Sequence, residues 1–237
     1  VHQGKKARCG LAWLSVTQGV VHLAECAHDE LADWIDRIGP SELLASAGMT
    51  PTFEQKLRSL KTTGRGSWAL ALRPDFQFDA GLGQRKLLEQ LQAASLAAWS
   101  ADTLNDAQAA AAALLTYAEH TQGRSLPHVQ RVQVQRSDAL IDLPASTRRN
   151  LELTQTLRGE DSPTLFSLLD TCMTGMGSRL LKSWLLSPPR DRQAAHDRLQ
   201  AQAVLRGESG AGVWSSLREQ LRGASDVERI TARTALR

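Results

Sequence analysis

Residues 141–192 read IDLPASTRRNLELTQTLRGEDSPTLFSLLDTCMTGMGSRLLKSWLLSPPRDR, and this stretch is dense in residues that begin and end helices. Pro144 is typical of the first turn of a helix, and Asp161, Ser162 and Pro163 break the chain before another helix. Two glycines then precede an apolar-periodic run, which two consecutive prolines end. The stretch therefore predicts several short helices, and few of its side chains could take part in catalysis.

Helical spacing continues beyond this stretch. We expect helices over residues 191–205 and 214–236, separated by a loop over residues 207–212. Gly177 belongs to the first turn of the helix that follows it. Because a glycine lets another backbone come close, we expect Gly177 to pack against a neighbouring helix. The second half of the chain is thus predicted to be all-α after a small opening hairpin.

The first half of the chain has a different pattern. Residues 9–26, CGLAWLSVTQGVVHLAEC, predict two strands joined by a turn at residues 17–19. The first strand is apolar on both faces, which is typical of a central strand covered on both sides. Its two faces consist of Leu11 and Trp13, and of Ala12, Leu14 and Val16. A helix over residues 29–38 and a short strand over 42–45 follow, so this half is predicted to be α/β.

The remaining elements of the first half have weaker patterns. They are a strand over residues 67–73 and helices over residues 84–96 and 102–120. The character of the chain changes around Gly123. Residues 131–134 and 140–143 are then expected to pair with each other as the small hairpin that opens the second half.

The 237-residue chain has the composition of an ordinary globular protein, with 42% hydrophobic and 22% charged residues. Its net charge of +3 is unevenly distributed. Residues 1–123 carry 11 Lys and Arg against 13 Asp and Glu, whereas residues 124–237 carry 17 against 12. A basic second half fits contact with phosphates, although such a surplus is also common on helical surfaces. We predict a boundary at the same point, between an α/β domain over 1–123 and a helical domain over 124–237.

The three cysteines, Cys9, Cys26 and Cys172, form no CxxC pair and are odd in number. This pattern predicts reduced thiols in a cytoplasmic protein. No apolar run approaches the ~20 residues of a membrane span, and the N-terminus lacks the apolar core of a signal peptide. The chain does not begin with Met and stops within a helical pattern, so we expect a piece of a longer protein.

Catalytic motifs are missing from the sequence. Gly4-Lys5-Lys6 is not a P-loop, the glycines at 81 and 83 lack the third glycine of a dinucleotide fingerprint, and Ser178 is not in a nucleophile elbow. The six histidines have no metal-ligand spacing. A two-metal nuclease needs several converging carboxylates, and Asp75 and Asp79 alone do not supply them. We therefore predict no catalytic, cofactor-binding or metal-binding residues.

Cations of the second half are the remaining candidates for a binding site. The possible phosphate contacts are Arg148, Arg149, Arg179 and Lys182. The alternative is that they lie on exposed helix faces and pair with nearby acids, namely Glu152, Glu160, Asp161 and Asp191. We favour the alternative, because no aromatic residues are interleaved with these cations as they are on single-strand binding surfaces.

Several short motifs follow one another between residues 145 and 185. They are Ala145-Ser-Thr-Arg-Arg-Asn-Leu-Glu152, Thr164-Leu165, Leu168-Leu-Asp170, Met176-Gly-Ser-Arg179 and Leu180-Leu-Lys-Ser-Trp-Leu185. In this order they resemble the MutS family of bacterial DNA mismatch-recognition proteins. The resemblance extends to residues 40–44, 115–127 and 226–237, and is weak over residues 46–105. Gly175 stands where the family usually has proline.

The resemblance implies a connector domain of ribonuclease-H-like fold followed by the first helices of the lever, or core, domain. In the family, the connector takes part in docking the partner protein MutL, and the lever relays the ATP state between the ATPase core and the DNA clamp. The whole protein is a homodimer that uses ATP and Mg²⁺. The family's Phe-x-Glu mismatch reader is missing here, since Phe53-Glu54-Gln55 has another order, and so are the ATPase motifs. We therefore expect a fragment that acts in DNA mismatch repair without enzymatic activity or a cofactor of its own.

Two other functions remain open at this point. One is a ribonuclease-H-like nuclease, which the lack of an acidic residue on the first predicted strand disfavours. The other is a free-standing, non-specific DNA-binding module. We expect this chain to bind duplex DNA weakly and without preference for a mismatch.

Overall fold

The computed structural model describes residues 1–15, 18–63, 68–122, 126–207 and 212–235. The chain forms two compact units. The N-terminal unit consists of Val1–Arg136 together with Thr231–Arg237, and the helical unit consists of Ser137–Ile230. The first is mixed α/β and the described part of the second contains helices without a strand, so the predicted succession of α/β and helical halves is confirmed.

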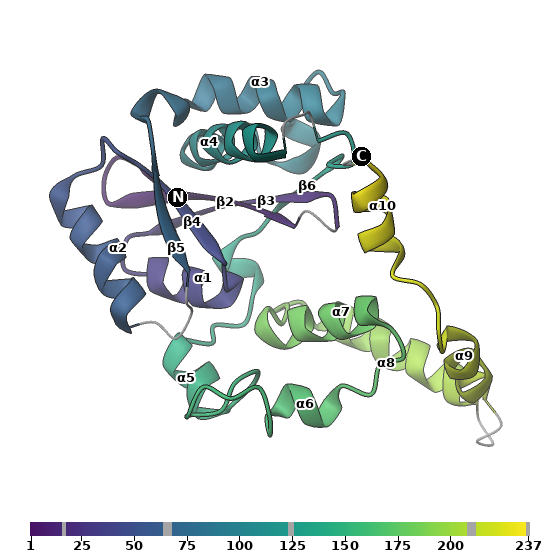
Figure 1. The fold of residues 1–237 in the computed structure, drawn as a ribbon. Helices are drawn as coiled ribbons and strands as arrows, with labels where there is room; N and C mark the ends of the chain where they lie inside the picture. The colour runs from purple at the N-terminus through teal and green to yellow at the C-terminus, as the bar shows by residue number, and fades with distance from the viewer. Residues whose placement is uncertain (16–17, 64–67, 123–125, 208–211, 236–237) are drawn as a thin grey trace. The chain divides into compact units, whose positions relative to one another are not determined.

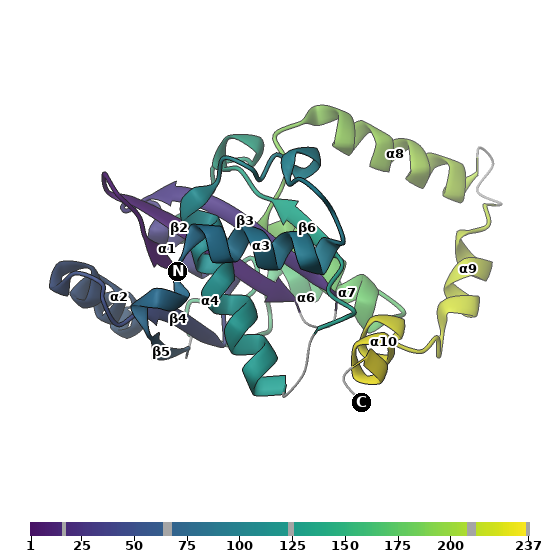
Figure 2. The same ribbon diagram turned by 90° about the horizontal axis from the view of Figure 1, so that it is seen from above.

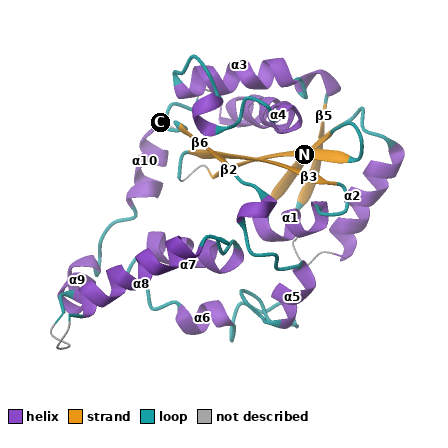
Figure 3. Cartoon of the chain, turned by 180° about the vertical axis from the view of Figure 1, so that it is seen from behind, coloured by secondary structure: helices purple, strands orange, loops and turns teal. Residues whose placement is uncertain are grey.

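Two sheets form the centre of the N-terminal unit, and Figure 3 distinguishes their strands from the surrounding helices. The larger sheet has the order β1-β2-β3-β6, with bounds His2–Gln3, Arg8–Ser15, Val20–Ala27 and Arg131–Val134. Its first three strands are antiparallel, and β6 is parallel to β3. The smaller sheet pairs β4 (Glu42–Ser46) with β5 (Ala69–Arg73) in parallel.

Helices cover both faces of the larger sheet. In Figure 1, α4 (Asn105–Gln122) lies between the sheet and α3 (Ala80–Leu91), while α1 (Leu31–Ile38) lies on the opposite side. α2 (Pro51–Thr63) connects the two strands of the smaller sheet. The short 3-10 helices are Asp75–Gln77 and Ala97–Trp99.

The alternation of side chains along β2 and β3 produces two separate cores. Cys9, Leu11, Ala24 and Cys26 point into a core formed with α1, α2 and β4. Val21 and Leu23 point to the other face, where they pack with residues of α3, α4 and β6. The predicted central strand is thus confirmed, because successive residues of β2 and β3 are buried on opposite faces.

Two glycines explain how α4 fits between the sheet and α3. A Cβ atom at Gly10 would lie 1.8 Å from the backbone oxygen of Asp106, and one at Gly83 would lie 1.8 Å from that of Gln108. Any side chain at either position would therefore displace the α4 backbone. The alanines of α4 serve the same close packing: Ala107, Ala109, Ala110, Ala111, Ala112 and Ala113 are all buried.

The helical unit is a succession of short helices, which Figure 2 shows from above. Their bounds are Ser137–Ala139 (a 3-10 helix), α5 Ala145–Asn150, α6 Leu165–Leu169, α7 Gly175–Leu186, α8 Arg192–Arg206, α9 Trp214–Leu221 and α10 Val227–Ala235. The breaks and ends predicted from Asp161-Ser162-Pro163 and from the paired prolines are confirmed. α10 crosses the boundary between the two units.

The expected hairpin between residues 131–134 and 140–143 is wrong. Residues 131–134 form β6, which pairs with β3, and Leu140 instead forms an isolated bridge with Pro189. The reason is burial: Val132 is largely buried in the core against α4, which a detached hairpin could not provide. The expected turn at residues 17–19 lies partly outside the described residues.

Other element bounds differ from the predicted ones. α3 begins at Ala80 instead of residue 84, because Asp79 accepts a hydrogen bond from the Leu82 N–H and caps it. α4 begins at Asn105 instead of residue 102. The sequence patterns also gave no indication of α2.

Within the described part of the chain, every helix is too short or too polar to cross a membrane.

Candidate functional site

The described residues contain no group of three or more His, Cys, Asp or Glu side chains that could hold a metal ion. The two acids considered for a nuclease have structural contacts. Asp75 accepts a hydrogen bond from the Ser46 hydroxyl over 2.6 Å, and Asp79 caps α3 through the Leu82 N–H. The best-defined cluster of charges among the described residues lies in the helical unit, where Arg179 binds Asp226 and Glu228, and Arg229 binds Asp226. We call these four residues the Arg179 joint.

Local sequence places each member of the Arg179 joint. Arg179 lies in α7, whose N-cap Thr174 accepts a hydrogen bond from the Gly177 N–H over 3.1 Å. Asp226 directly precedes α10 and accepts a hydrogen bond from the Arg229 N–H over 3.2 Å. Glu228 is in the first turn of α10, where a carboxylate is favoured by the helix dipole.

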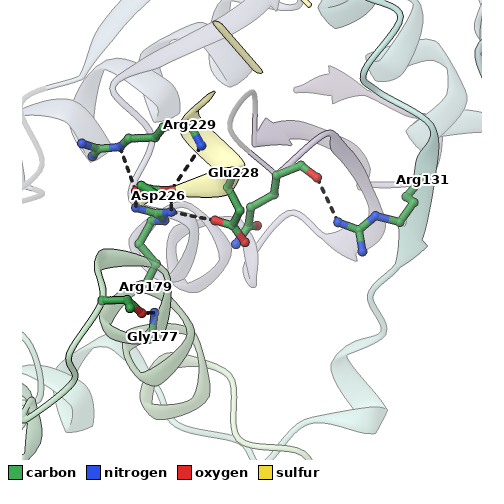
Figure 4. Close-up of polar contacts among 8 residues, drawn as sticks. Arg131, Gly177, Arg179, Asp226, Glu228 and Arg229 are labelled. Atoms are coloured by element: carbon green, nitrogen blue, oxygen red, sulfur yellow. Dashed lines mark hydrogen bonds and ion pairs between the residues drawn. The ribbon is translucent and has the colours of Figure 1, made fainter. Parts of the chain in front are cut away.

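The guanidinium of Arg179 binds both acids at once, as Figure 4 shows. Its Nη1 donates to Asp226 Oδ2 over 2.8 Å and its Nη2 to Asp226 Oδ1 over 2.9 Å. The same Nη2 donates to Glu228 Oε2 over 2.7 Å. Arg229 adds a longer ion pair to Asp226, with 3.6 Å between Nε and Oδ2. This parallel two-point contact fixes direction as well as distance between α7 and the start of α10.

The charges of the Arg179 joint stabilise one another. Hydrogen bonds from Arg179 are the main reason that the pKa of Asp226 falls from 3.8 to about 2. The hydrogen bonds to Asp226 and Glu228 in turn raise the pKa of Arg179 above its ordinary value. Arg179 and Asp226 therefore both stay charged over the ordinary pH range, and their contact holds without proton transfer.

The structure separates the four predicted phosphate contacts. Arg148 is buried and donates through Nη1 to the Leu143 carbonyl over 2.5 Å, and Arg179 is held in the joint. Arg149 is exposed at the end of α5. Lys182 is exposed on α7, with its Nζ 5.9 Å from the Phe166 ring centre. Only Arg149 and Lys182 among these four therefore present an exposed cation.

Two of the acids expected as partners of these cations have other contacts. The Glu152 carboxylate accepts a hydrogen bond from the Leu157 N–H, and Asp191 caps α8 through the Gln193 N–H. Arg179 finds its acids 47 and 49 residues further along the chain. Local spacing does not predict this pairing, because the two acids lie far outside the neighbouring turns, within the family-like motif at residues 226–237.

The expectation that Gly177 packs against a neighbouring helix is wrong. A Cβ atom there would meet Thr174 Oγ1 and Cys172 Cβ at 3.3 Å, both in the turn that leads into α7. The glycine is therefore close to its own N-cap. Ser178 joins this turn by donating a hydrogen bond to Asp170 Oδ1 over 2.9 Å, which lowers the pKa of Asp170.

A backbone bridge closes the first part of the helical unit into a loop. The Ile141 N–H donates to the Pro188 carbonyl over 2.9 Å, and the Arg190 N–H donates to the Ala139 carbonyl over 2.9 Å. Between them, Leu140 and Pro189 form the isolated antiparallel bridge. The stretch from 141 to 188, which contains α5, α6 and α7, thus begins and ends at adjacent points.

Comparison with known protein families gives two matches, one for each part of the chain. Residues 1–130 match the family described as MutS domain II, and residues 146–237 match the family described as MutS domain III. The first match covers β1 to β5 and α1 to α4, and the second covers the Arg179 joint and most of the closed loop. With more than half of its length in the first match alone, the chain belongs to the MutS family.

Proposed function

We propose that this chain acts in DNA mismatch repair as the part of a MutS protein that links other domains and relays conformational changes between them. The observation that carries the proposal is the succession of MutS domains II and III as two compact units of different architecture. A linking element needs folded parts with a defined connection rather than an active site. The described residues fit this need, since they contain a charge joint and a closed loop but no cluster of metal-ligating side chains.

The internal contacts of the helical unit support a relay. Conformational coupling between distant sites requires packed elements that take discrete arrangements. The bidentate contact of Arg179 with Asp226 is directional. It therefore favours two arrangements of α7 and the start of α10, one with both hydrogen bonds formed and one with both broken. The bridge between Leu140 and Pro189 similarly holds the two ends of the loop together.

The partners belong to the same proposal. The N-terminal unit is the proposed docking site for MutL, and it is proposed to have the ribonuclease-H-like fold. ATP and Mg²⁺ would act in other domains of a homodimeric, cytoplasmic MutS protein, with no cofactor in this chain. The alternation of β2 and β3 between two cores is compatible with such a fold, because it places helices on both faces of a mixed sheet.

Hydrogen exchange of the chain with and without purified MutL tests both parts of the proposal. We expect MutL to protect amides within residues 1–136 and to change exchange in α7 and the first turn of α10. Arg179→Gln should abolish the second effect and leave the first unchanged. Arg206→Gln, at an exposed arginine at the end of α8, is the matched control and should retain both effects.

Two results would overturn the proposal. Lack of any protection at saturating MutL would refute docking to this chain. Protection of residues 1–136 with unchanged exchange in the helical unit would refute the relay, because the two units would then respond independently.

A further inference from the structure

Cys9 and Cys26 lie directly opposite each other on neighbouring antiparallel strands. They are register partners in the pairing of β2 with β3. Both are reduced and buried, with 0% and 4% of their surface exposed, and both belong to the same hydrophobic core. Cys172, in contrast, is exposed and lies in the helical unit. Cys9 and Cys26 are therefore neighbouring thiols in the core of the N-terminal unit, and Cys172 is not close to them in the sequence or in the same unit.

The geometry of this pair suits a covalent bond between the two sulfur atoms. Opposed residues in antiparallel strands have Cα atoms about 4.5 or 5.5 Å apart, depending on the pair type. Both values lie within the range of about 4.4 to 6.8 Å that disulfides span. The two side chains lie on the same face of the sheet, in the same hydrophobic core. The strands thus need little movement to be joined.

The two thiols differ in their readiness to react. The hydrogen bond from Cys26 is the main reason that the pKa of Cys9 is lowered, and the positive charge of Lys56 adds to this effect. The same hydrogen bond and burial raise the pKa of Cys26. Since the thiolate is the nucleophile, the lowered pKa favours Cys9 as the sulfur that reacts first and Cys26 as the one that follows.

We propose that Cys9 and Cys26 form a modification site at which a peroxide produces a reversible cross-strand disulfide. The Cys9 thiolate attacks one peroxide oxygen, the O–O bond breaks, and Cys9 becomes a sulfenic acid while hydroxide leaves and takes up a proton. The Cys26 sulfur then attacks Cys9, the S–O bond breaks, and the departing hydroxide takes the Cys26 proton. Two thiols are oxidised, one hydrogen peroxide is reduced, and two waters form.

The bond would join β2 to β3 at the end of the strand pair that is far from their connecting turn. It would also constrain the unfolded chain. Because Cys9 is fully buried, peroxide reaches it only when the surrounding structure opens locally. The oxidised protein then exchanges and unfolds less readily than the reduced one. A dithiol reverses the reaction by thiol–disulfide exchange.

Peroxide treatment of the Cys172→Ser protein tests the proposal, because this background removes the exposed thiol. After treatment and denaturing alkylation, we expect a monomer lighter by two hydrogen atoms, with no alkylatable thiol and with a peptide linkage between residues 9 and 26. Its melting temperature should rise by several degrees and return after dithiothreitol. Two thiols that remain alkylatable, or sulfinic acid at Cys9 with a free Cys26, would overturn the proposal.

Single variants in the same background test the order of the steps. Cys26→Ala should stop the reaction at a Cys9 sulfenic acid that dimedone traps. Cys9→Ala should leave Cys26 unmodified at the same peroxide dose. A dimedone adduct on Cys26 and none on Cys9 would overturn the assignment of Cys9 as the attacking thiol. Circular dichroism of each variant shows whether it is folded. If a variant does not fold, the result with the Cys172→Ser protein alone decides whether the disulfide forms.

Discussion

Trp13 and His22 stack across β2 and β3, with ring centroids 5.0 Å apart and ring planes 11° apart. They are opposed residues in the strand pairing, so the stack is part of the sheet itself. Burial, with a smaller contribution from the positive charge of Arg131, lowers the pKa of His22 from 6.5 to about 4. The folded protein therefore holds this imidazole neutral where the unfolded chain would protonate it.

The lowered pKa of the buried His22 predicts a loss of stability in weak acid. Above pH 6.5 both states carry neutral His22, and as the pH falls towards 4 only the unfolded chain gains the proton. The pKa difference corresponds to at most about 3 kcal/mol of unfolding free energy. His22→Gln should reduce this pH dependence in urea denaturation between pH 7 and 4.5. His120→Gln, at an exposed histidine of α4, should keep the dependence of the original chain; equal slopes for all three proteins would contradict the prediction.

The close approach of α3 to α4 predicts that Gly83 tolerates no side chain. Gly83→Ala should lower the unfolding free energy by about 3 kcal/mol, because the new Cβ overlaps the Gln108 backbone oxygen. Gly81→Ala in the same helix is the matched control, with its Cβ no closer than 3.3 Å to the Asp79 carboxylate. It should leave stability unchanged or raise it by up to about 1 kcal/mol through helix propensity. Similar losses for both variants in urea denaturation would refute the close-packing argument.

The Arg179 joint predicts a second loss of stability, at lower pH than the one that His22 causes. The folded pKa of Asp226 is about 2 against an ordinary 3.8, so its contribution is complete above about pH 4 and is lost as the pH falls through 2. Calorimetry should show Asp226→Asn melting below the original chain at pH 5, with the difference shrinking towards pH 2. Asp197→Asn, at an exposed acid of α8, should show no such change. A constant difference for Asp226→Asn across this range would exclude the ion pair as its cause.

Arg149 and Lys182 are the candidates that remain for phosphate contact. We predict weak binding of duplex DNA, equal for a G·T heteroduplex and its homoduplex in a titration at fixed salt. Replacing both residues by Gln should weaken binding and reduce the salt dependence, by about one unit of log–log slope for each phosphate that the protein no longer neutralises. Arg85→Gln, at an exposed arginine of α3, should change neither. A preference for the mismatch, or an equal effect of Arg85→Gln, would contradict this.

The sequence predicts those parts of the fold that depend on interactions between residues close together in the chain. The alternation of Leu11 to Leu14 predicted a strand covered on both faces, and the Asp161 to Pro163 break predicted a helix boundary, since period and punctuation are local signals. The parallel pairing of β6 with β3 was not predictable in this way. It joins Val20 to Arg131 across most of the N-terminal unit and depends on burial of Val132.

The candidate site follows the same division. The sequence identifies Arg179 and Lys182 as candidate phosphate contacts. Residue type alone does not show which of these cations forms an ion pair within the folded chain and which stays exposed. Arg179 is held by acids nearly fifty residues away, and Arg148 is buried against a carbonyl of its own turn. Only the folded backbone brings these groups together.

The bridge between Leu140 and Pro189 makes residues 141–188 an insertion in the topological sense. A segment whose two ends meet can be removed, lengthened or exchanged without redirecting the chain that enters and leaves it. Replacement by a short linker would preserve the route from residue 139 to residue 190, where the Arg190 N–H already donates to the Ala139 carbonyl. The stretch richest in family motifs thus enters and leaves the helical unit at one point, and Arg179 holds it to the start of α10.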